Sequence, residues 1–531
     1  MMRILAASLL ILVAGTALAG EDKVLELKLR KREETSPGSG RFHALVKPAQ
    51  WEAGKTAVIV CDMWDLHHCL NATRRGGEMA PRVDAFLKNL RDRGATVIHA
   101  PSSCMDAYKE HPSRKRAQAV PRAKNLPAAI GEWCHRIPSE EKGTYPIDQS
   151  DGGEDDDLKE HQAWAKKLAG LGRDPRAPWK SQMEALTIDP ARDFVSDSGE
   201  EIWSILDQRG IDQVILVGVH TNMCVLGRPF GLRQMAKNGK NVVLVRDLTD
   251  TMYNPARPPH VSHFTGTDLI IEHIEKWVCP TITSDQILGG KPFRFSGDKR
   301  PHVVVLMAED EYKTEKTLPP FALANLGKSC QVSLVFAADK SLNDLPGLDV
   351  VNDADVLLVS VRRRVLPPRQ LALIRKHIEA GKPVVGIRTA SHAFSLREGK
   401  TPEGMTAWPE FDAQVFAGNY QGHHKDGPTT TVQATPEGQK HPILKGVDTA
   451  NWTSEASLYR VRPLGKTATV LLTGSIEGQE AEPIAWINAG PNGNRVFYTS
   501  LGHESDFKKP AFAQMLRNAV LWAAGTSAPA E

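Results

Sequence analysis

The chain has 531 residues, of which 41% are hydrophobic and 24% are charged. This length is too great for one hydrophobic core, and the composition excludes a disordered chain, a collagen-like fibre and a multispanning membrane protein. The 66 Lys and Arg residues nearly balance the 63 Asp and Glu residues, so bulk charge gives no sign of a nucleic-acid or acidic-membrane partner. We therefore expect two or three globular domains and a small-molecule substrate.

The first 19 residues have the pattern of a signal peptide. Arg3 is their only charged residue, the run 4–14 is apolar except for one serine, and the small-residue pattern Ala17-Leu18-Ala19 follows. The apolar run is shorter than the roughly 20 residues that cross a bilayer, which favours a cleaved peptide over a membrane anchor. We expect an exported protein, periplasmic or extracellular, with no membrane span in the mature chain. The sequence leaves a homo-oligomer open.

The chain has seven cysteines, an odd number, so at least one thiol is unpaired within the chain. This density is too low for a disulfide scaffold. A free thiol that persists in an oxidising compartment is either buried or chemically useful.

The order of apolar runs predicts two domains. Residues 20–45 are charged, with little periodicity, and we expect an irregular lead-in. From residue 46, short β-branched runs alternate with amphipathic helical runs, which is typical of parallel α/β units. Residues 291–300 are polar and broken by Pro292 and Gly297, so a linker is expected there. The prediction is two doubly wound, three-layer α/β/α domains with mostly parallel sheets, at 46–290 and 301–526, followed by a tail at 527–531.

The strands expected in the first domain are 57–61, 96–100, 214–219 and 241–246. In the second domain, strands are expected at 302–307, 332–336, 355–360, 384–388, 469–473, 484–487 and 495–499, with helices at 369–380 and 510–522.

Two residues at strand ends of the first domain suggest thiol-based acyl transfer. Asp62 ends the first strand, and Cys224 lies just beyond the strand 214–219. In open parallel sheets ligands collect at the carboxyl ends of the strands, so these side chains are expected to converge. A thiol at the start of a helix is favoured as thiolate. The alternative is that Cys224 is a small core residue.

Asp62 and the segment Gly-Val-His-Thr-Asn-Met-Cys-Val around Cys224 resemble the isochorismatase-like cysteine hydrolases over roughly residues 50–285. The resemblance implies Asp62 as general base, Cys224 as nucleophile and a lysine as third member. It also implies a cis peptide bond between Val219 and His220, with the amides of His220 and Cys224 forming an oxyanion hole.

The family lysine is expected near residues 185–198, where this sequence has none. Lys180 lies upstream, and Arg192 is a cation near the expected place. We take both as candidates, although an arginine could supply only electrostatic stabilisation.

Further residues are expected to line the same site. The candidates for substrate binding are Trp64, His67, His68, Thr221, Asn222 and Tyr253, and Arg228, Asp247, Asp250 and His263 could shape the pocket. No cofactor is predicted. A divalent metal stays open, because Asp65 and His67 have a spacing that two ligands could use, but we assign no metal ligand. The acidic segment 152–157 is expected to be a solvated loop, with calcium binding as the alternative.

Polar residues recur in the expected loops of the second domain. His392 follows the strand 384–388, and the others are His423, His424, Glu455, Tyr459 and His503, which together could form a polyol or metal pocket. These segments and the closing helix 510–522 resemble the trehalose-utilisation (ThuA-like) domain over about residues 300–526. The resemblance implies a fold similar to class I glutamine amidotransferases and an association with carbohydrate metabolism. The turn 389–392 has no cysteine, so glutaminase chemistry is not implied.

The preferred hypothesis is an exported hydrolase that cleaves a small amide or related bond through Cys224 and Asp62. One alternative is a carbohydrate-binding or sugar-modifying protein whose first domain is catalytically inactive. In the variant of that alternative in which the second domain is the catalyst, its histidines and Glu455 would act on a sugar.

Overall fold

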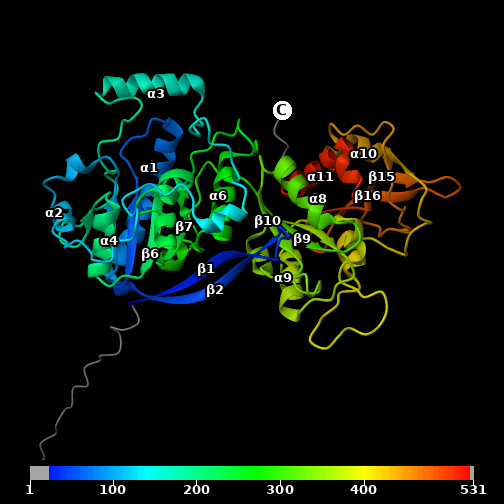
Figure 1. Cartoon of the computed structure of the whole chain (residues 1–531). Helices are drawn as coiled ribbons and strands as arrows, with labels where there is room; N and C mark the ends of the chain where they lie inside the picture. Colours follow the sequence, from blue (N-terminus) through cyan, green and yellow to red (C-terminus); the bar gives the residue numbers. More distant parts are fainter. Residues whose placement is uncertain (1–22, 527–531) are drawn as a thin grey trace, which may run out of the picture.

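The computed structural model describes residues 23–526 and contains two α/β domains (Figure 1). The expected signal peptide and the tail 527–531 lie outside the described residues. Within them, none of the helices has both the length and the apolar character needed to cross a bilayer.

The first domain is built on an eight-stranded sheet with the order β2-β1-β8-β7-β6-β3-β4-β5. The strands β3 to β8 run parallel, and β1 and β2 form an antiparallel hairpin at one edge. The bounds are β1 Val24–Glu34, β2 Phe42–Glu52, β3 Thr56–Cys61, β4 Thr96–Ala100, β5 Phe194–Val195, β6 Gln213–Val219, β7 Asn241–Asp250 and β8 Thr281–Ile282.

Helices cover both faces of this sheet, as the alternating burial of its strands requires. On β3, Val58 and Val60 pack against one apolar layer, and Ala57 and Ile59 pack against the other. One layer includes α1 (Leu70–Asp92) and α7 (Asp285–Leu288). The other includes α2 (Pro112–Gln118), α4 (Gly199–Gln208), α5 (Leu232–Lys237) and α6 (His263–Trp277), and α3 (Leu158–Gly170) lies farther out (Figure 1).

The expected irregular lead-in is wrong, because residues 24–34 and 42–52 pair along their whole length. Leu25 and Leu27 are buried and alternate with charged residues, which is the two-residue period of a strand. The density of charge hid this period, and those charges are neutralised only in the fold. Arg30, for example, pairs with the buried Glu275 at 2.7 Å.

The hairpin also reaches the second domain (Figure 1). Near its tip, Arg41 pairs with Asp339 at 2.9 Å, and Thr35 donates a hydrogen bond to the same carboxylate. The segment 291–300 is held to the first domain, because the Phe293 amide donates to Asp247 at 2.8 Å and Arg300 pairs with Asp268 at 2.8 Å.

The second domain has a nine-stranded sheet with the order β10-β9-β11-β12-β17-β16-β15-β13-β14. Five neighbouring strands run parallel, namely β10, β9, β11, β12 and β17. The remaining strands pair antiparallel. The bounds are β9 His302–Ala308, β10 Gln331–Phe336, β11 Val356–Val361, β12 Val384–Ile387, β13 Thr430–Ala434, β14 Thr453–Ser454, β15 Thr469–Ser475, β16 Glu482–Ala489 and β17 Arg495–Thr499.

Helices α8 (Thr314–Phe321) and α11 (Pro510–Ala523) pack on one face of this sheet, α9 (Pro368–Glu379) packs on the other, and α10 (Pro436–Lys440) lies beside β15. Proline at the first position of α11 fits its start, because that amide has no partner within the helix. Both domains are therefore doubly wound, three-layer α/β/α folds, as the sequence predicts.

Candidate active site

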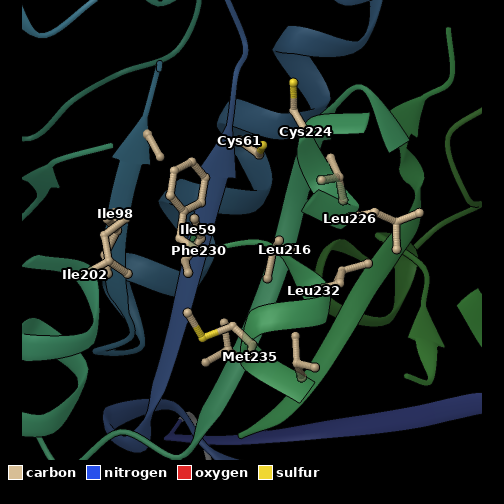
Figure 2. Packing of buried hydrophobic residues seen from close by; sticks show 14 of the residues in the cluster. Ile59, Cys61, Ile98, Ile202, Leu216, Cys224, Leu226, Phe230, Leu232 and Met235 are labelled. Carbon is tan, nitrogen blue, oxygen red and sulfur yellow. The ribbon is translucent and has the colours of Figure 1, made fainter. Parts of the chain in front are cut away.

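The carboxyl ends of β3 and β6 lie side by side at the centre of the first sheet. Cys61 and Gly218 are paired in register, and a Cβ atom on Gly218 would stand 2.0 Å from the Cys61 carbonyl oxygen. Only glycine allows this approach, and its φ of +110° also favours glycine. Figure 2 shows Cys224 at the turn above this strand end, with its sulfur directed away from Leu216 and Met235 in the core.

Asp62, Cys224 and Arg228 meet at this edge. Asp62 is fully buried in a left-handed conformation, with φ of +46°. One of its oxygens accepts the Ser102 amide at 2.8 Å, and the other accepts Arg228 Nε at 2.8 Å. The Cys224 thiol lies close enough to the Asp62 carboxylate for that charge to raise the pKa of the thiol, and the His220 amide opposes this rise. A thiol, a carboxylate and a guanidinium therefore share one largely buried cluster.

The electrostatics of the cluster differ from the thiolate expected at a helix start. Cys224 lies in a π-helical turn, Thr221–Val225, and burial together with the charge of Asp62 raises the pKa of its thiol. Burial also raises the pKa of Asp62, which the Arg228 guanidinium opposes. The resting site holds a neutral thiol beside a carboxyl group that is a stronger base than an exposed aspartate.

Neither predicted cation reaches this cluster. Arg192 is half exposed and pairs with Asp189 at 2.6 Å and with Asp92 at 3.1 Å. Asp92 ends α1 near the amino ends of the strands, so Arg192 lies at the opposite edge of the sheet. Lys180 lies closer, but its amine donates to the Gly172 carbonyl at 3.4 Å.

Arg228, rather than either predicted cation, lies beside Asp62. Its guanidinium lies over two indole rings, 6.0 Å from the centre of Trp64 and 5.4 Å from that of Trp133. The sequence signal was its position four residues after Cys224, about one helical turn, which brings both side chains to one side.

A group of aromatic rings lies beside the cluster. Trp64 stacks on Trp179 with centroids 4.5 Å apart, and the His67 ring lies 5.9 Å from each of them. His67 also packs edge-on against His220 at 4.7 Å, whereas His68 pairs with Glu154 at 3.1 Å. Trp64, His67 and His68 thus lie near the cluster, together with Trp179, which the sequence analysis did not name; their role in substrate binding stays a prediction.

The side chains of three other predicted substrate-binding residues make hydrogen bonds within the domain instead. The Asn222 side chain donates to Gln149 and to the Met252 carbonyl and accepts the Met252 amide, so it has no free polar atom for a ligand. The hydroxyl of Tyr253, which is fully buried, donates to the Arg257 carbonyl at 2.8 Å. Thr221 shares a 2.7 Å hydroxyl hydrogen bond with Thr249.

The spacing of Asp65 and His67 does not produce a ligand pair. Asp65 pairs with Arg173 at 2.9 Å, and His67 Nδ1 accepts the Cys69 amide at 3.1 Å. Cys69, Asp155 and Asp156 bring possible ligand atoms within 4.8 Å of one another. However, Arg75 neutralises Asp155 at 2.7 Å, and Asp156 accepts two amides at the start of α1, which leaves them satisfied without a cation.

The acidic segment 152–157 is a loop, as expected, but it is only partly solvated, because Gly152 and Asp157 are exposed whereas Asp155 and Asp156 are half-buried. Arg75 bridges it to Asp250 at 2.7 Å, and His263 bonds Asp250 at 2.9 Å. Asp247, another proposed pocket residue, accepts three hydrogen bonds from Ser284 and Phe293.

The peptide bond between Val219 and His220 is cis, which is the geometry the resemblance implies. The oxyanion role of the His220 and Cys224 amides stays a prediction. All seven cysteines are unpaired and buried, which agrees with the odd count.

A second polar cluster lies at the carboxyl edge of β12 in the second domain. The His392 ring stacks on Tyr420 with centroids 4.3 Å apart, and Tyr459 lies 4.7 Å from Tyr420. Buried Arg388 lies 4.0 Å from the centre of the Tyr459 ring and 4.7 Å from that of Tyr312. The sequence identified His392 and Tyr459 but missed the roles of the arginine and the other tyrosines.

The remaining residues of the predicted second-domain pocket do not all converge. Glu455 is exposed, and the exposed His423 is turned to the His424 carbonyl at 2.8 Å. His424 lies 3.8 Å from Glu482. Only His503 joins the cluster, through an edge-on contact with Tyr312 at 5.9 Å.

Comparisons with known families agree with this division. The model of the isochorismatase domain matches residues 177–262, which include Cys224 and Arg228, and the trehalose-utilisation (ThuA) model matches residues 302–523. The chain joins an isochorismatase-like domain to a ThuA-like domain. A search of curated proteins finds no relative.

Solved structures with similar folds match each half. A ThuA-like protein from Bacteroides uniformis is 19% identical, with a TM-score of 0.33 over 44% of this chain and 95% of its own. An isochorismatase family protein from Burkholderia thailandensis is 16% identical, with a TM-score of 0.25 over 44% of this chain and 94% of its own. Asp62 lies before the residues that the isochorismatase model matches, so its place in the site comes from the geometry of β3 and β6.

Proposed function

We propose that the isochorismatase-like domain hydrolyses a small amide or related acyl compound through Cys224. The observation that carries this proposal is the cluster in which the Cys224 thiol lies beside the buried Asp62 carboxylate, to which Arg228 Nε donates a hydrogen bond at 2.8 Å. A base in contact with the thiol removes the need for a resting thiolate, since the proton leaves as the sulfur attacks.

The reaction takes place in two balanced steps. The sulfur attacks the acyl carbon while Asp62 takes the thiol proton, and the tetrahedral intermediate collapses to a thioester as that proton passes to the leaving amine. Water then attacks the thioester with Asp62 as base, which releases the acid and restores the thiol. Arg228 cannot carry protons, so it acts by holding negative charge on Asp62.

The rings of Trp64, Trp179 and His67 favour a substrate with a flat face. Aromatic side chains bind such groups by offset stacking, and Arg228 over two indoles would attract a negative group on the substrate.

A panel of aromatic and aliphatic amides and esters, assayed with the full chain, tests the proposal. Turnover should disappear in Cys224→Ala and persist in Cys330→Ala, which removes a buried thiol from the other domain. An acyl adduct on Cys224, trapped by acid quench and found by peptide mass spectrometry, would support the thioester. Equal turnover by wild type and Cys224→Ala would overturn the hydrolase and leave the alternative of a binding protein with a silent first domain.

We also propose that the protein is exported, on the sequence of residues 1–19. Expression of the full chain should give a mature form that begins at Gly20, which N-terminal sequencing checks.

A further inference from the structure

Two loops of the ThuA-like domain form one unit at the carboxyl edge of its parallel strands. The Arg363 amide, two residues past β11, donates to the His392 carbonyl at 3.1 Å, and the Arg364 amide donates to Ala393 at 2.7 Å. Arg363 and Arg388 both adopt left-handed conformations, with φ of +52° and +47°. Such conformations are costly for residues other than glycine and gather at functional sites.

Arg363 differs from its neighbours in its charge partners. Arg362 pairs with Asp310 and Glu311, and Arg364 pairs with Asp310. In the part of the chain that the structure describes, no carboxylate lies within 4.0 Å of Arg363. Its polar contact is one 3.4 Å hydrogen bond to the Ser395 hydroxyl, and its Nε is buried without a partner.

Among the described residues, the side chains that flank Arg363 supply no negative charge to balance its own. Its guanidinium lies 6.0 Å from the centre of the Tyr420 ring, on which His392 stacks. Burial and four nearby arginines lower the pKa of His392 to about 2, so the imidazole is neutral and adds no positive charge of its own. A partly desolvated cation without a counter-ion is unfavourable unless an anion joins it.

We propose that Arg363, flanked by His392 and Tyr420, binds the oxyanion group of a small organic molecule, a carboxylate or a phosphate. The guanidinium fork matches both groups with paired hydrogen bonds, and the stacked His392 and Tyr420 rings are the groups beside it that the rest of the ligand would meet. The site lies where open α/β sheets collect ligands, beyond the carboxyl ends of neighbouring parallel strands. It is separate from Cys224 and does not depend on hydrolysis in the first domain.

Isothermal titration of the full chain with glucuronate, glucose 6-phosphate and glucose tests this site. Glucuronate and glucose share one ring and differ at a carboxylate, and the phosphate ester distinguishes the two oxyanions. At least one anionic probe should bind at least tenfold more tightly than glucose.

The matched variants are Arg363→Gln and Arg362→Gln, which remove the same charge from adjacent positions. Arg363→Gln should weaken anion binding about tenfold or more, because it removes charged hydrogen bonds to the ligand. Arg362→Gln should change the Kd less than about threefold, since that arginine is already neutralised. Circular dichroism and thermal unfolding confirm folding, and Arg363→Lys, which keeps the charge but loses the fork, replaces Arg363→Gln if it fails to fold. Equal binding of glucose and both anions, or equal weakening by the two glutamine variants, would overturn the proposal.

Discussion

Replacing Arg228 with glutamine gives a sharp test of the active-site geometry. The substitution leaves Asp62 fully buried, with a hydrogen bond from the Ser102 amide but without the cation beside it. Removing one partner of a buried ion pair costs about 3–5 kcal/mol, because the other charge is left uncompensated. We expect Arg228→Gln to lower the free energy of unfolding by about 3 kcal/mol at pH 7.

The pH dependence of that loss identifies Asp62 as its cause. Without Arg228, the pKa of Asp62 rises further above its unfolded value, so the folded state binds more protons than the unfolded state and stability falls as pH rises. The difference between variant and wild type should therefore shrink as pH is lowered, by at most about 1.4 kcal/mol per pH unit. The acid limb of any hydrolase activity should move to higher pH, by about one to three units, because Asp62 must be ionised to accept the thiol proton.

Urea unfolding at several values between pH 5 and pH 7 measures both quantities. Arg192→Gln is the control, since its ion pairs with Asp189 and Asp92 are exposed and worth at most about 1 kcal/mol. A loss below about 1 kcal/mol for Arg228→Gln, or a loss that does not change with pH, would refute the role of Arg228 as the counter-ion of buried Asp62.

Three further changes test the frame of the two domains by unfolding experiments. Glu140 is buried against Arg233, and hydrogen bonds hold its pKa at about 2, so its ionised form contributes roughly 3 kcal/mol at neutral pH that is lost as pH falls from about 4.5 toward 2. Glu140→Gln should abolish that part of the acid sensitivity, and an unchanged acid profile would contradict the assignment. Burial raises the pKa of Asp412 from its unfolded value near 3.8 to about 7, so the fold loses stability as pH rises from about 4 to 7, and the stability of Asp412→Asn relative to wild type should increase over that range and level off above it. Gly218→Ala places a Cβ against the Cys61 carbonyl and should lower the free energy of unfolding of the first domain by several kcal/mol. A variant with normal stability would show that β3 and β6 approach less closely.

Much of the architecture could be predicted because burial in a parallel sheet leaves a direct pattern in the chain. Runs such as 214–219 and 302–307 are buried on both faces, and each appears as an interior strand within a residue or two of its expected ends. The β1–β2 hairpin was missed because its strands are not apolar on both faces and so leave only a weak pattern in the sequence. One of its faces is charged, and its ion pairs with α6 exist only after folding.

Only part of the candidate site could be predicted from the sequence. Asp62 and Cys224 were identified because strand ends of a parallel sheet converge, a rule that needs no coordinates. Arg192 was chosen by its position in the chain, but in the folded structure it lies at the opposite edge of the sheet. Tyr253 and Asn222 were chosen as polar residues near the site, but their hydrogen-bonding groups are already used by neighbouring loops.

The sequence by itself determined the two sheets, their order along the chain and the two strand ends where a thiol and a carboxylate could meet. These follow from hydrophobic burial, which is local and periodic. Which cation stands beside Asp62, whether the thiol is charged, and which arginine lacks a counter-ion were decided only by the tertiary structure. Charges interact over a few ångströms between segments far apart in the chain. Whether Arg228 or Arg363 has a charge partner therefore depends on neighbours that sequence spacing does not show.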